Sequence, residues 1–437
     1  MKAHEATENE RRKNRPESLS PDMIILAIGF VIGCFIDKHV LFLFPALALI
    51  VSIMRYNKGL ELVLYVSGIN FGYLFFAPGE MGGLNPNAFI TVGQIIFLLV
   101  GFFKIKQIKL DKNTVLFLIF TLISASSLLY TSNLFNGVKV LANIAQYLLT
   151  LMIFYNIQGI SREKIMKIIV VSALISILVV YPIQILQGDN LFLQDNERGG
   201  RFSGGAVHPV PLALFFSLAF YAALYLYDKY RQKKYLLMEL VAIAFTLATI
   251  TRAAILGLFV TIIAYVYYKN KLKYILPVAV IMVIAFAGPI SEYAFKQDAR
   301  YAESNLNYIS SGRINLWKES LSVFDASPLT GTGVGSSIDI LEKFDISVPH
   351  NDFIRVLLEV GIIGFAVFIT FTGMQGLRVW MNAKENAVLA CMFIFFIITM
   401  ITDSQLDYNL YYTFPFFILL GLENRILDDK KRIDVKE

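Results

Sequence analysis

The sequence predicts an all-α protein: a polytopic bundle of about 12–14 transmembrane helices with a helical domain in an external loop. The chain is 56% hydrophobic and only 16% charged, and its mean hydropathy is +0.61. Apolar runs long enough to cross the ~30 Å hydrocarbon layer recur from Met23 to Leu422, with short charged breaks between them. This composition excludes an ordinary soluble domain.

Fourteen candidate spans follow one another along the chain. They lie near 23–36, 40–54, 59–77, 89–103, 114–131, 137–157, 165–187, 207–228, 235–251, 253–268, 274–291, 353–373, 386–402 and 408–422. The predicted organisation is a cytosolic basic arm (1–22), a transmembrane bundle (23–291) with an external loop at 188–207, a large external loop with an amphipathic helix (292–352), C-terminal transmembrane helices (353–422) and a cytosolic tail (423–437).

The distribution of basic residues predicts the topology. With the arm "RRKNR" (Arg11 to Arg15) placed in the cytosol, alternation along the spans puts 28 of the 39 Lys and Arg residues on the cytosolic side. Each short cytosolic loop carries at least two of them. The net charge of +6 is therefore interpreted as a consequence of the topology, with the basic segments next to anionic membrane lipids. No nucleic-acid partner is predicted.

Several classes of chemistry have no motif in the chain. There is no nucleotide-binding glycine loop on the cytosolic side, no H-E-x-x-H, no clustered Cys/His set and no G-x-S-x-G. The two cysteines, Cys34 and Cys391, fall in separate spans and predict no disulfide framework. No metal or cofactor is predicted, and an enzyme of this kind would take its energy from an activated substrate.

Two arginines stand out near the predicted outer face. Arg252, in "LATITRAAILGLF", lies between two spans with almost no loop. At the centre of a bilayer it would cost at least ~2.5–3.5 kcal/mol, so it should face a protein cavity or anchor the helix at the interface. Arg201, in "ERGGRFSGG", has glycines on both sides that would let the backbone fold over a ligand, although a single loop arginine is usually just solvated.

The long outer loop contains "SSGRINLWKESLSVFDASPLTGTGVGSS". Its apolar residues at spacings of three, four and three predict an amphipathic helix on the membrane or on the bundle: Ile314, Trp317, Leu321 and Phe324. Arg313 begins this helix and Pro328 ends it. The following "GTGVG" lacks the Lys-Ser/Thr of a phosphate loop, so a structural role is predicted.

The loop then leads into "VPHNDFIRVLLEVGIIGF", which places His350 at the beginning of a span. Asn351 or Asp352 can cap the next helix, and Arg355 and Glu359 have the spacing of an intrahelical ion pair. Two interpretations are open for this group. The histidine can serve only as part of a helix cap, with Glu359 neutralising Arg355, or these residues and the outer arginines can form one functional site.

At these residues the sequence resembles a known family. "PHNDFIRVLLEVGIIGF" resembles the H-N-x-x-(L/I)-x-x-L-x-E-x-G-x-x-G-x pattern of the O-antigen ligase and O-antigen polymerase superfamily. "GRINLWKESLSVFDASPLTGTGVGSS" is similar to its R-x-x-x-W…P-(L/F)-x-G-x-G stretch, and "ITRAAILG" resembles its (S/T)-R-(G/A) helix start, with TRA for the commoner SRG. The resemblance runs from about Arg201 to Gly364.

The resemblance implies a GT-C-like membrane glycosyltransferase. It would move an oligosaccharide from undecaprenyl diphosphate to an acceptor hydroxyl at the outer side of the bacterial inner membrane, without a metal. The implied partners are the lipid-linked glycan donor, a glycan or lipid A core acceptor, membrane lipids, and a chain-length regulator and a flippase. In this family the histidine of the H-N motif, here His350, and arginines that correspond to Arg252 and Arg201 are the functional residues.

The residue types agree with that chemistry. Cleavage of a sugar–diphosphate bond sends negative charge onto phosphate oxygens, and arginine offers permanently ionised, planar donors. The acceptor hydroxyl benefits from a base, and an imidazole can be neutral at ambient pH. A single displacement would invert the anomeric carbon. The predicted roles are His350 as base or acceptor-orienting group, Arg252, Arg201 and Arg313 as diphosphate-binding groups, and Asn351, Arg355 and Glu359 as supporting residues.

Other functions remain open at the level of sequence. A polymerase and a ligase differ in their acceptor, and the motifs do not separate them; the number of spans and the lack of a lipid-A-specific sequence favour a surface-polysaccharide polymerase. A transporter of lipid-linked sugars would show related halves and ionisable residues near the midplane, whereas the unusual charges here gather at the outer edge. A scaffold without catalysis would tolerate His350→Ala.

Overall fold

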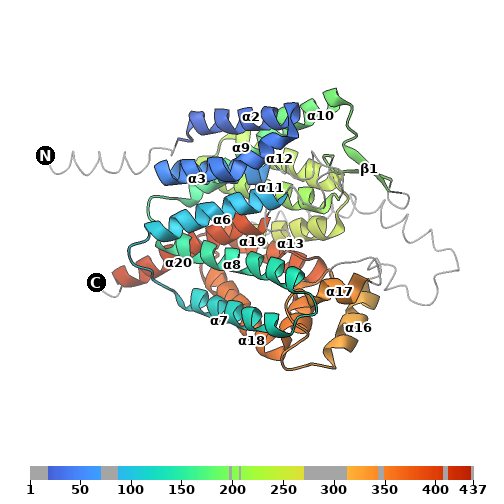
Figure 1. Ribbon diagram of the computed structural model, residues 1–437. Coiled ribbons are helices and arrows are strands. Elements are labelled where there is room, and N and C mark those ends of the chain that lie inside the picture. Colours follow the sequence, from blue (N-terminus) through green and yellow to red (C-terminus); the bar gives the residue numbers. More distant parts are fainter. Residues whose placement is uncertain are drawn as a thin grey trace.

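The structure is a computed structural model that describes residues 18–69, 87–195, 199–205, 208–269, 313–342, 349–406 and 412–434. In this part of the chain most segments are helical. The axes of most helices are roughly aligned with one another, in parallel or antiparallel orientation (Figure 1). The sheet within these residues is a single two-stranded hairpin. The predicted all-α bundle is therefore confirmed.

The elements follow the chain in this order: α2 (Pro21–Ile36), η1 (Lys38–Leu43), α3 (Phe44–Met54), α4 (Tyr56–Gly68), α6 (Asn87–Lys104), α7 (Lys112–Ser126), η2 (Ser127–Tyr130), α8 (Leu134–Asn156), α9 (Arg162–Ile175), η3 (Ser176–Val180), α10 (Tyr181–Gln187), β1 (Phe192–Asp195), β2 (Gly199–Phe202), α11 (Val210–Tyr230), α12 (Lys233–Ala248), α13 (Arg252–Tyr268), α16 (Arg313–Phe324), α17 (Ser336–Glu342), α18 (Asp352–Met381), α19 (Ala387–Thr402) and α20 (Phe414–Asp434).

Helices coincide with each predicted span except 274–291, which lies outside the described residues. The last part of the span predicted at 59–77 and the start of the one at 408–422 also lie outside them. Within the described residues, five helical stretches are long and apolar enough to cross a membrane, and further apolar helices of 10–17 residues accompany them. The chain is thus a helical, multi-pass membrane protein.

Helix α11 forms the centre of the bundle. Every residue from Val210 to Leu224 is buried, which explains why this helix is apolar on all sides. Phe216 stacks on Phe245 of α12 with ring centroids 4.6 Å apart. The Tyr221 hydroxyl lies 2.6 Å from the Thr261 hydroxyl of α13. These contacts fix α12 and α13, whose outer ends carry candidate site residues.

Polar side chains inside the bundle are hydrogen-bonded to one another. Gln146 of α8 donates to Gln94 of α6 at 2.5 Å, and Gln94 donates to the Ser67 hydroxyl of α4 at 2.8 Å. All three side chains are buried. In an apolar environment an unpaired amide is costly, so this chain of bonds ties three helices together.

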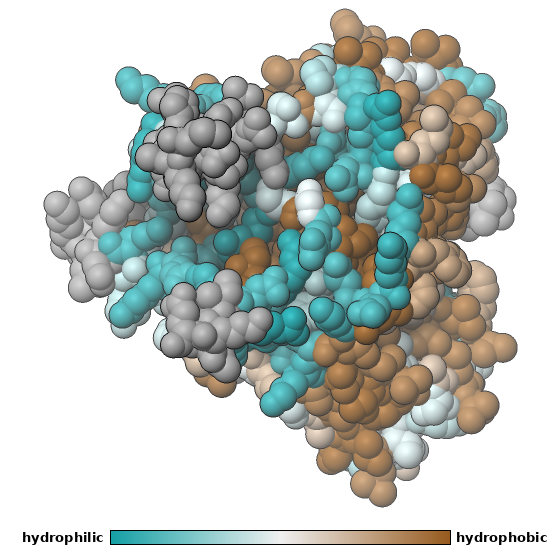
Figure 2. Space-filling model, turned by 90° about the vertical axis from the view of Figure 1, so that its left-hand side faces the viewer, coloured by the Kyte–Doolittle hydropathy of each residue, from teal (hydrophilic) through white to brown (hydrophobic). Residues whose placement is uncertain are grey.

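The two ends of the bundle differ in their charges. The chain termini lie at one end, and β1, α16 and α17 lie at the other (Figure 1). Ion pairs are numerous at the end with the termini: Arg378 lies 2.7 Å from Asp111, and Lys164 lies 2.7 Å from Glu61. Figure 2 shows this face, with hydrophilic residues across much of it and hydrophobic residues to the right and below. This is the face predicted to be cytosolic.

Helix α20 extends into the segment predicted as the C-terminal tail. Helix α20 continues without a break from Phe414 to Asp434, so residues predicted as tail from 423 onward belong to it. Glu423 is buried and lies 2.5 Å from Arg162, and Asn424 accepts a hydrogen bond from Gln375 at 3.1 Å. The predicted span ended at Leu422 because Glu423 and Asn424 are polar. The residues that pair with them in the structure are distant in sequence, so the sequence alone does not indicate that they are buried.

The amphipathic helix of the outer loop exists as α16, but its buried face differs from the prediction. Leu316 and Ser320 are the residues of α16 that are buried. Leu321, which was predicted to belong to the apolar face, is 39% exposed. The helix packs against α17 and α18, so close helix contact selects the face with the small Ser320 rather than the most apolar stripe.

Candidate functional site

A histidine and an aspartate form the centre of the candidate site. His350 lies two residues before the first residue of α18, and Asp403 is the residue that follows α19. The Nδ1 atom of His350 lies 3.0 Å from Asp403 Oδ1. The histidine side chain is 28% exposed, whereas that of Asp403 is 3% exposed. The imidazole therefore presents its other nitrogen, Nε2, away from a buried carboxylate that fixes the ring.

The backbone around His350 is held from both sides. His350 adopts a left-handed conformation with φ 50°, which is uncommon for a residue other than glycine. On one side the Trp317 indole N–H of α16 donates to the Pro349 carbonyl at 2.9 Å. On the other, the Asn351 carboxamide oxygen accepts from two amides of the first turn of α18 at 3.0 and 3.1 Å. Asn351 is thus the N-cap of α18. It is one of the two residues that the sequence predicted for this role.

Arg313 contacts Asp403 from the opposite side. Its Nη2 lies 3.9 Å from Asp403 Oδ2, and its Nη1 donates to the carbonyl of Thr402 at the end of α19. Burial opposes ionisation of Asp403, but the hydrogen bond with His350 and the charge of Arg313 hold the pKa of Asp403 below its usual value. Arg313, predicted to bind diphosphate, is therefore placed as a counter-charge to Asp403.

Arg201 lies in the external hairpin predicted as a loop at 188–207. Strands β1 and β2 pair antiparallel, and Phe202 packs edge-on against Phe245 of α12 with centroids 5.2 Å apart. The Arg201 side chain is buried, and its Nε donates to the Thr249 carbonyl at 3.1 Å. Arg201 is thus folded onto the C-terminal end of α12, instead of being a solvated loop residue.

The pairing of α13 with α19 gives the position of the other arginine. Gly257 of α13 lies against the ring of Phe395, and the thiol of Cys391 donates to the Thr261 carbonyl at 3.3 Å. Residue numbers rise on one helix as they fall on the other, so the two helices are antiparallel. The packing is close because Gly257 has no side chain to separate them.

This register brings the predicted site residues to one end of the bundle. Arg252 is the first residue of α13, five residues before Gly257, and is therefore level with Met400, close to the end of α19 where Asp403 lies. Arg201 contacts the carbonyl three residues before Arg252. The arrangement places two guanidinium groups and the imidazole of His350 at the same end of the bundle.

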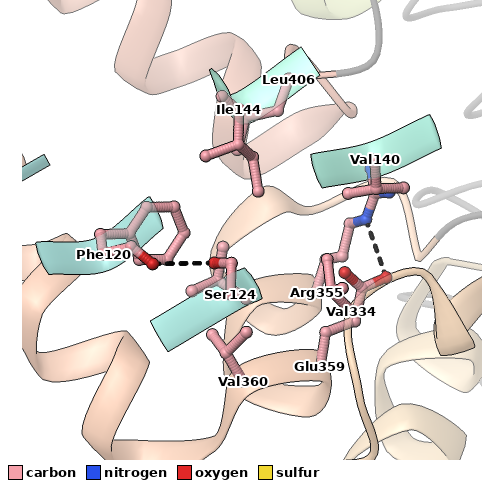
Figure 3. A pocket seen from close by; sticks show the side chains of 10 residues that line it. Phe120, Ser124, Val140, Ile144, Val334, Arg355, Glu359, Val360 and Leu406 are labelled. Carbon is pink, nitrogen blue, oxygen red and sulfur yellow. Dashed lines mark hydrogen bonds and ion pairs between the residues drawn. The ribbon is translucent and has the colours of Figure 1, made fainter. Parts of the chain in front are cut away.

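The predicted ion pair within α18 is confirmed. Arg355 Nε lies 3.1 Å from Glu359 Oε1, and both side chains are buried. The Ser337 hydroxyl of α17 donates to the same carboxylate oxygen at 2.5 Å. The pair lines a small pocket between α7, α8 and α18 with a volume of about 20 Å³ (Figure 3). This volume can hold one or two water molecules but not a sugar. The Arg355–Glu359 pair is therefore interpreted as a structural support for the first part of α18.

The "GTGVG" segment fills a break in α18. Gly361 has φ 67° and ψ −174°, which interrupts the helical ladder. The Gly333 amide donates to the Glu359 carbonyl at 2.9 Å, and the Ile362 amide donates to the Pro328 carbonyl at 2.9 Å. The loop therefore satisfies backbone groups that the break leaves open. Its predicted structural role is consistent with these contacts.

Sequence reasoning missed Asp403. It follows the predicted span 386–402 directly and belongs to none of the motifs singled out from the sequence. The available signal was a carboxylate at the outer end of a span, where burial requires a partner. In the described residues no group of three His, Cys, Asp or Glu side chains is placed to hold a metal ion.

Residues 237–369 match the family model described as O-antigen ligase. This part of the chain is therefore similar to the O-antigen ligase family. This confirms the resemblance to the O-antigen ligase and polymerase superfamily, and it implies a membrane enzyme that transfers glycosyl groups between a lipid-linked glycan and an acceptor. No curated protein matches the chain.

The matched region does not contain the whole candidate site. It begins in α12 and ends in α18, and it includes Arg252, Arg313, His350, Asn351, Arg355 and Glu359. Arg201 precedes it, and Asp403 follows it by 34 residues. The packing of the hairpin on α12 and of α19 on α13 brings these two outer residues to the matched region.

Proposed function

We propose that the protein transfers a glycan from undecaprenyl diphosphate to an acceptor hydroxyl at the outer face of the bacterial inner membrane. The observation that carries this proposal is the His350–Asp403 pair at the same end of the bundle as Arg252 and Arg201. A base and fixed positive charges are the two things that this displacement needs from a protein.

The proposed reaction is a single displacement. His350 accepts the proton of the acceptor hydroxyl through Nε2, while the oxygen forms a bond to the anomeric carbon of the donor sugar. The bond between that carbon and the diphosphate oxygen breaks, and its electron pair leaves with the diphosphate. Asp403 stabilises the imidazolium that results, as a buried carboxylate beside Nδ1. The anomeric configuration is inverted, because one displacement occurs.

Arg252 and Arg201 are proposed to bind the diphosphate. Guanidinium groups offer several donors in a plane and stay ionised, so they neutralise the charge that grows on the leaving group. In this proposal Arg313 acts through Asp403, and Asn351, Arg355 and Glu359 hold the outer end of α18. The polyprenyl tail would lie in the bilayer beside the bundle.

The acceptor is proposed to be a second lipid-linked repeat, which makes the protein a surface-polysaccharide polymerase; a ligase would instead use lipid A core. Reconstitution in liposomes tests this choice. The donor is the lipid-linked repeat extracted from the organism's own cells, offered alone and with lipid A core. Lengthening of the lipid-linked glycan indicates a polymerase, and glycan on the core indicates a ligase. Sugar that crosses the bilayer unchanged would contradict both.

Two variants test the assigned residues in the same assay. His350→Ala and Arg252→Lys are expected to lower kcat/KM by at least about 10²-fold, through loss of the base and of the planar donor respectively. Lys318→Ala, which removes an exposed cation from α16, is the matched control and should retain wild-type transfer. Wild-type turnover by either of the first two variants, with normal expression, would overturn its proposed role.

A further inference from the structure

The turn after α19 carries buried side chains that lack partners. Ser404 is 1% exposed and Gln405 is 0% exposed. Within the described part of the chain, neither the Ser404 hydroxyl nor either polar atom of the Gln405 carboxamide has a hydrogen-bond partner. A carboxamide offers two donors and an acceptor, and leaving it buried and unpaired costs about 1–3 kcal/mol or more.

The backbone of this turn is, by contrast, firmly bonded. The Leu406 amide donates to Asp352 Oδ2 at 3.2 Å, and the Leu406 carbonyl accepts from the Tyr147 hydroxyl at 2.9 Å. The Gln405 carbonyl accepts from the Thr413 hydroxyl at 2.8 Å. Bonds to α18, α8 and the start of α20 therefore fix the turn. These bonds set the backbone from which the two side chains project.

The unpaired groups belong to the two residues that follow Asp403, the partner of the proposed base. The Ser404 amide donates to Asp403 Oδ1 at 2.9 Å, the same oxygen that faces His350. On the neighbouring helix, the Thr251 hydroxyl beside Arg252 is also buried and lacks a partner among the described residues. Neutral donors and acceptors thus occur in the residues that follow Asp403, the partner of the imidazole, and in the residue that precedes Arg252.

We propose that Ser404 and Gln405 bind hydroxyl groups of the acceptor saccharide and so determine which acceptor is used. This inference rests on the proposed function. Sugar hydroxyls both donate and accept, and a carboxamide beside a hydroxyl matches that property without adding charge near the reacting carbon. An attachment point on the turn that holds His350 favours the acceptor over the donor, because the acceptor hydroxyl must reach the imidazole.

Binding also requires a movement. Gln405 is covered in this structure, so neighbouring side chains must move aside before a sugar reaches it. Hydrogen bonds with the sugar would then remove the free-energy cost of leaving these polar groups buried and unpaired. A site built to bond a hydroxyl strongly rejects a ligand that lacks it, which gives the turn its power to discriminate.

The test compares Gln405→Met with Gln184→Met. Methionine is close in size to glutamine and has no amide. Gln184 of α10 is also 0% exposed and without a partner for its carboxamide in the described residues, and α10 lies at the opposite edge of the bundle from α18 (Figure 1). Because each change removes an unsatisfied buried amide, neither variant is expected to have a lower Tm than the wild type.

The probe is the free repeat saccharide released from its lipid by mild acid, with lipid A core oligosaccharide offered in parallel. Neither carries a diphosphate leaving group, so each can act only as acceptor. Gln405→Met should raise the acceptor KM by about 10-fold or more and leave the donor KM near wild type. It should also abolish the Tm increase that the accepted saccharide gives. Gln184→Met should retain both wild-type values.

Several outcomes overturn the inference. Gln405→Met could retain the wild-type acceptor KM and the same Tm increase with saccharide. This result would show that the Gln405 amide does not bind the acceptor. A lower Tm without saccharide would indicate that the amide is satisfied by structural water. A raised donor KM would indicate that Gln405 binds the donor instead of the acceptor. Saccharide binding by the wild type without any transfer would instead refute the proposed function, which separates the two failures.

Discussion

At the scale of single residues, the orientation of His350 depends on a few contacts from distant parts of the chain. Asp403 fixes Nδ1 of the ring, and Trp317 holds the carbonyl of the preceding residue. Burial raises the pKa of Asp403, whereas the hydrogen bond with His350 and the charge of Arg313 lower it below its usual value. The proposed base is therefore positioned by residues that need not touch the sugar.

Asp403→Asn tests this arrangement. An asparagine keeps the size of the side chain but removes the charge that stabilises the imidazolium. Transfer by Asp403→Asn should show a kcat lower by about 10²-fold, with a smaller change in the donor KM, because the diphosphate is held elsewhere. Steady-state kinetics over a range of donor concentrations measure the two effects. An unchanged kcat would exclude Asp403 from a positioning role.

Local patterns predicted part of this site. The cap at Asn351 and the pair of Arg355 with Glu359 depend on residues three or four positions apart, so sequence spacing was sufficient. The bond between His350 and Asp403 joins residues 53 positions apart. It depends on how α18 and α19 pack, and no local pattern contains that information.

At the scale of elements, α18 consists of two helical parts joined at Gly361. A β-carbon at this position would lie 2.3 Å from the Leu329 carbonyl oxygen, and φ is 67°. The close approach lets the loop from Pro328 to Gly333 bond to the interrupted helix. The loop in turn fixes the outer part of α18, which begins two residues after His350.

Gly361→Ala is expected to destabilise the protein. The clash and the strained backbone should together cost at least about 1–3 kcal/mol, seen as a lower Tm in detergent and a loss of transfer. Gly373→Ala is the control on the same helix. Nothing lies within 4 Å of the position that a β-carbon would take there, so this change should be neutral or stabilising by up to about 1 kcal/mol. Equal Tm values for the two variants would contradict the role of the break.

The helix α16 illustrates the limit of periodicity. Spacing predicted a helix that begins at Arg313 and is ended by Pro328; the observed helix begins at Arg313 and ends earlier, at Phe324. The face that packs on α18 contains Ser320, whose small side chain allows close contact. Hydrophobicity alone favoured Leu321, which is partly exposed. Sequence therefore located the element but not its orientation.

At the scale of the whole molecule, helix positions followed from the length of apolar runs and the spacing of charges. A hydrocarbon layer of ~30 Å imposes these lengths, so the bundle could be predicted. The hairpin at Arg201 and the extension of α20 past Leu422 could not, since both depend on contacts between distant segments. The same holds for the acceptor, which no helix pattern encodes.

The topology can be tested by labelling with a membrane-impermeant maleimide. Cys34 and Cys391 are both buried and should give little background. Lys318→Cys on α16 should be labelled in intact spheroplasts, because this end of the bundle is predicted to face outward. Lys430→Cys, at the opposite end, should be labelled only after permeabilisation. Labelling in the reverse order would place the site on the cytosolic side.

The most direct measurement of the central claim is a cryo-electron microscopy structure of His350→Ala with the undecaprenyl-diphosphate-linked donor bound. The account predicts density for the diphosphate in contact with Arg252 and Arg201, with the anomeric carbon facing the space left by the imidazole. Diphosphate density away from both arginines, or on the far side of the bundle from Asp403, would contradict it.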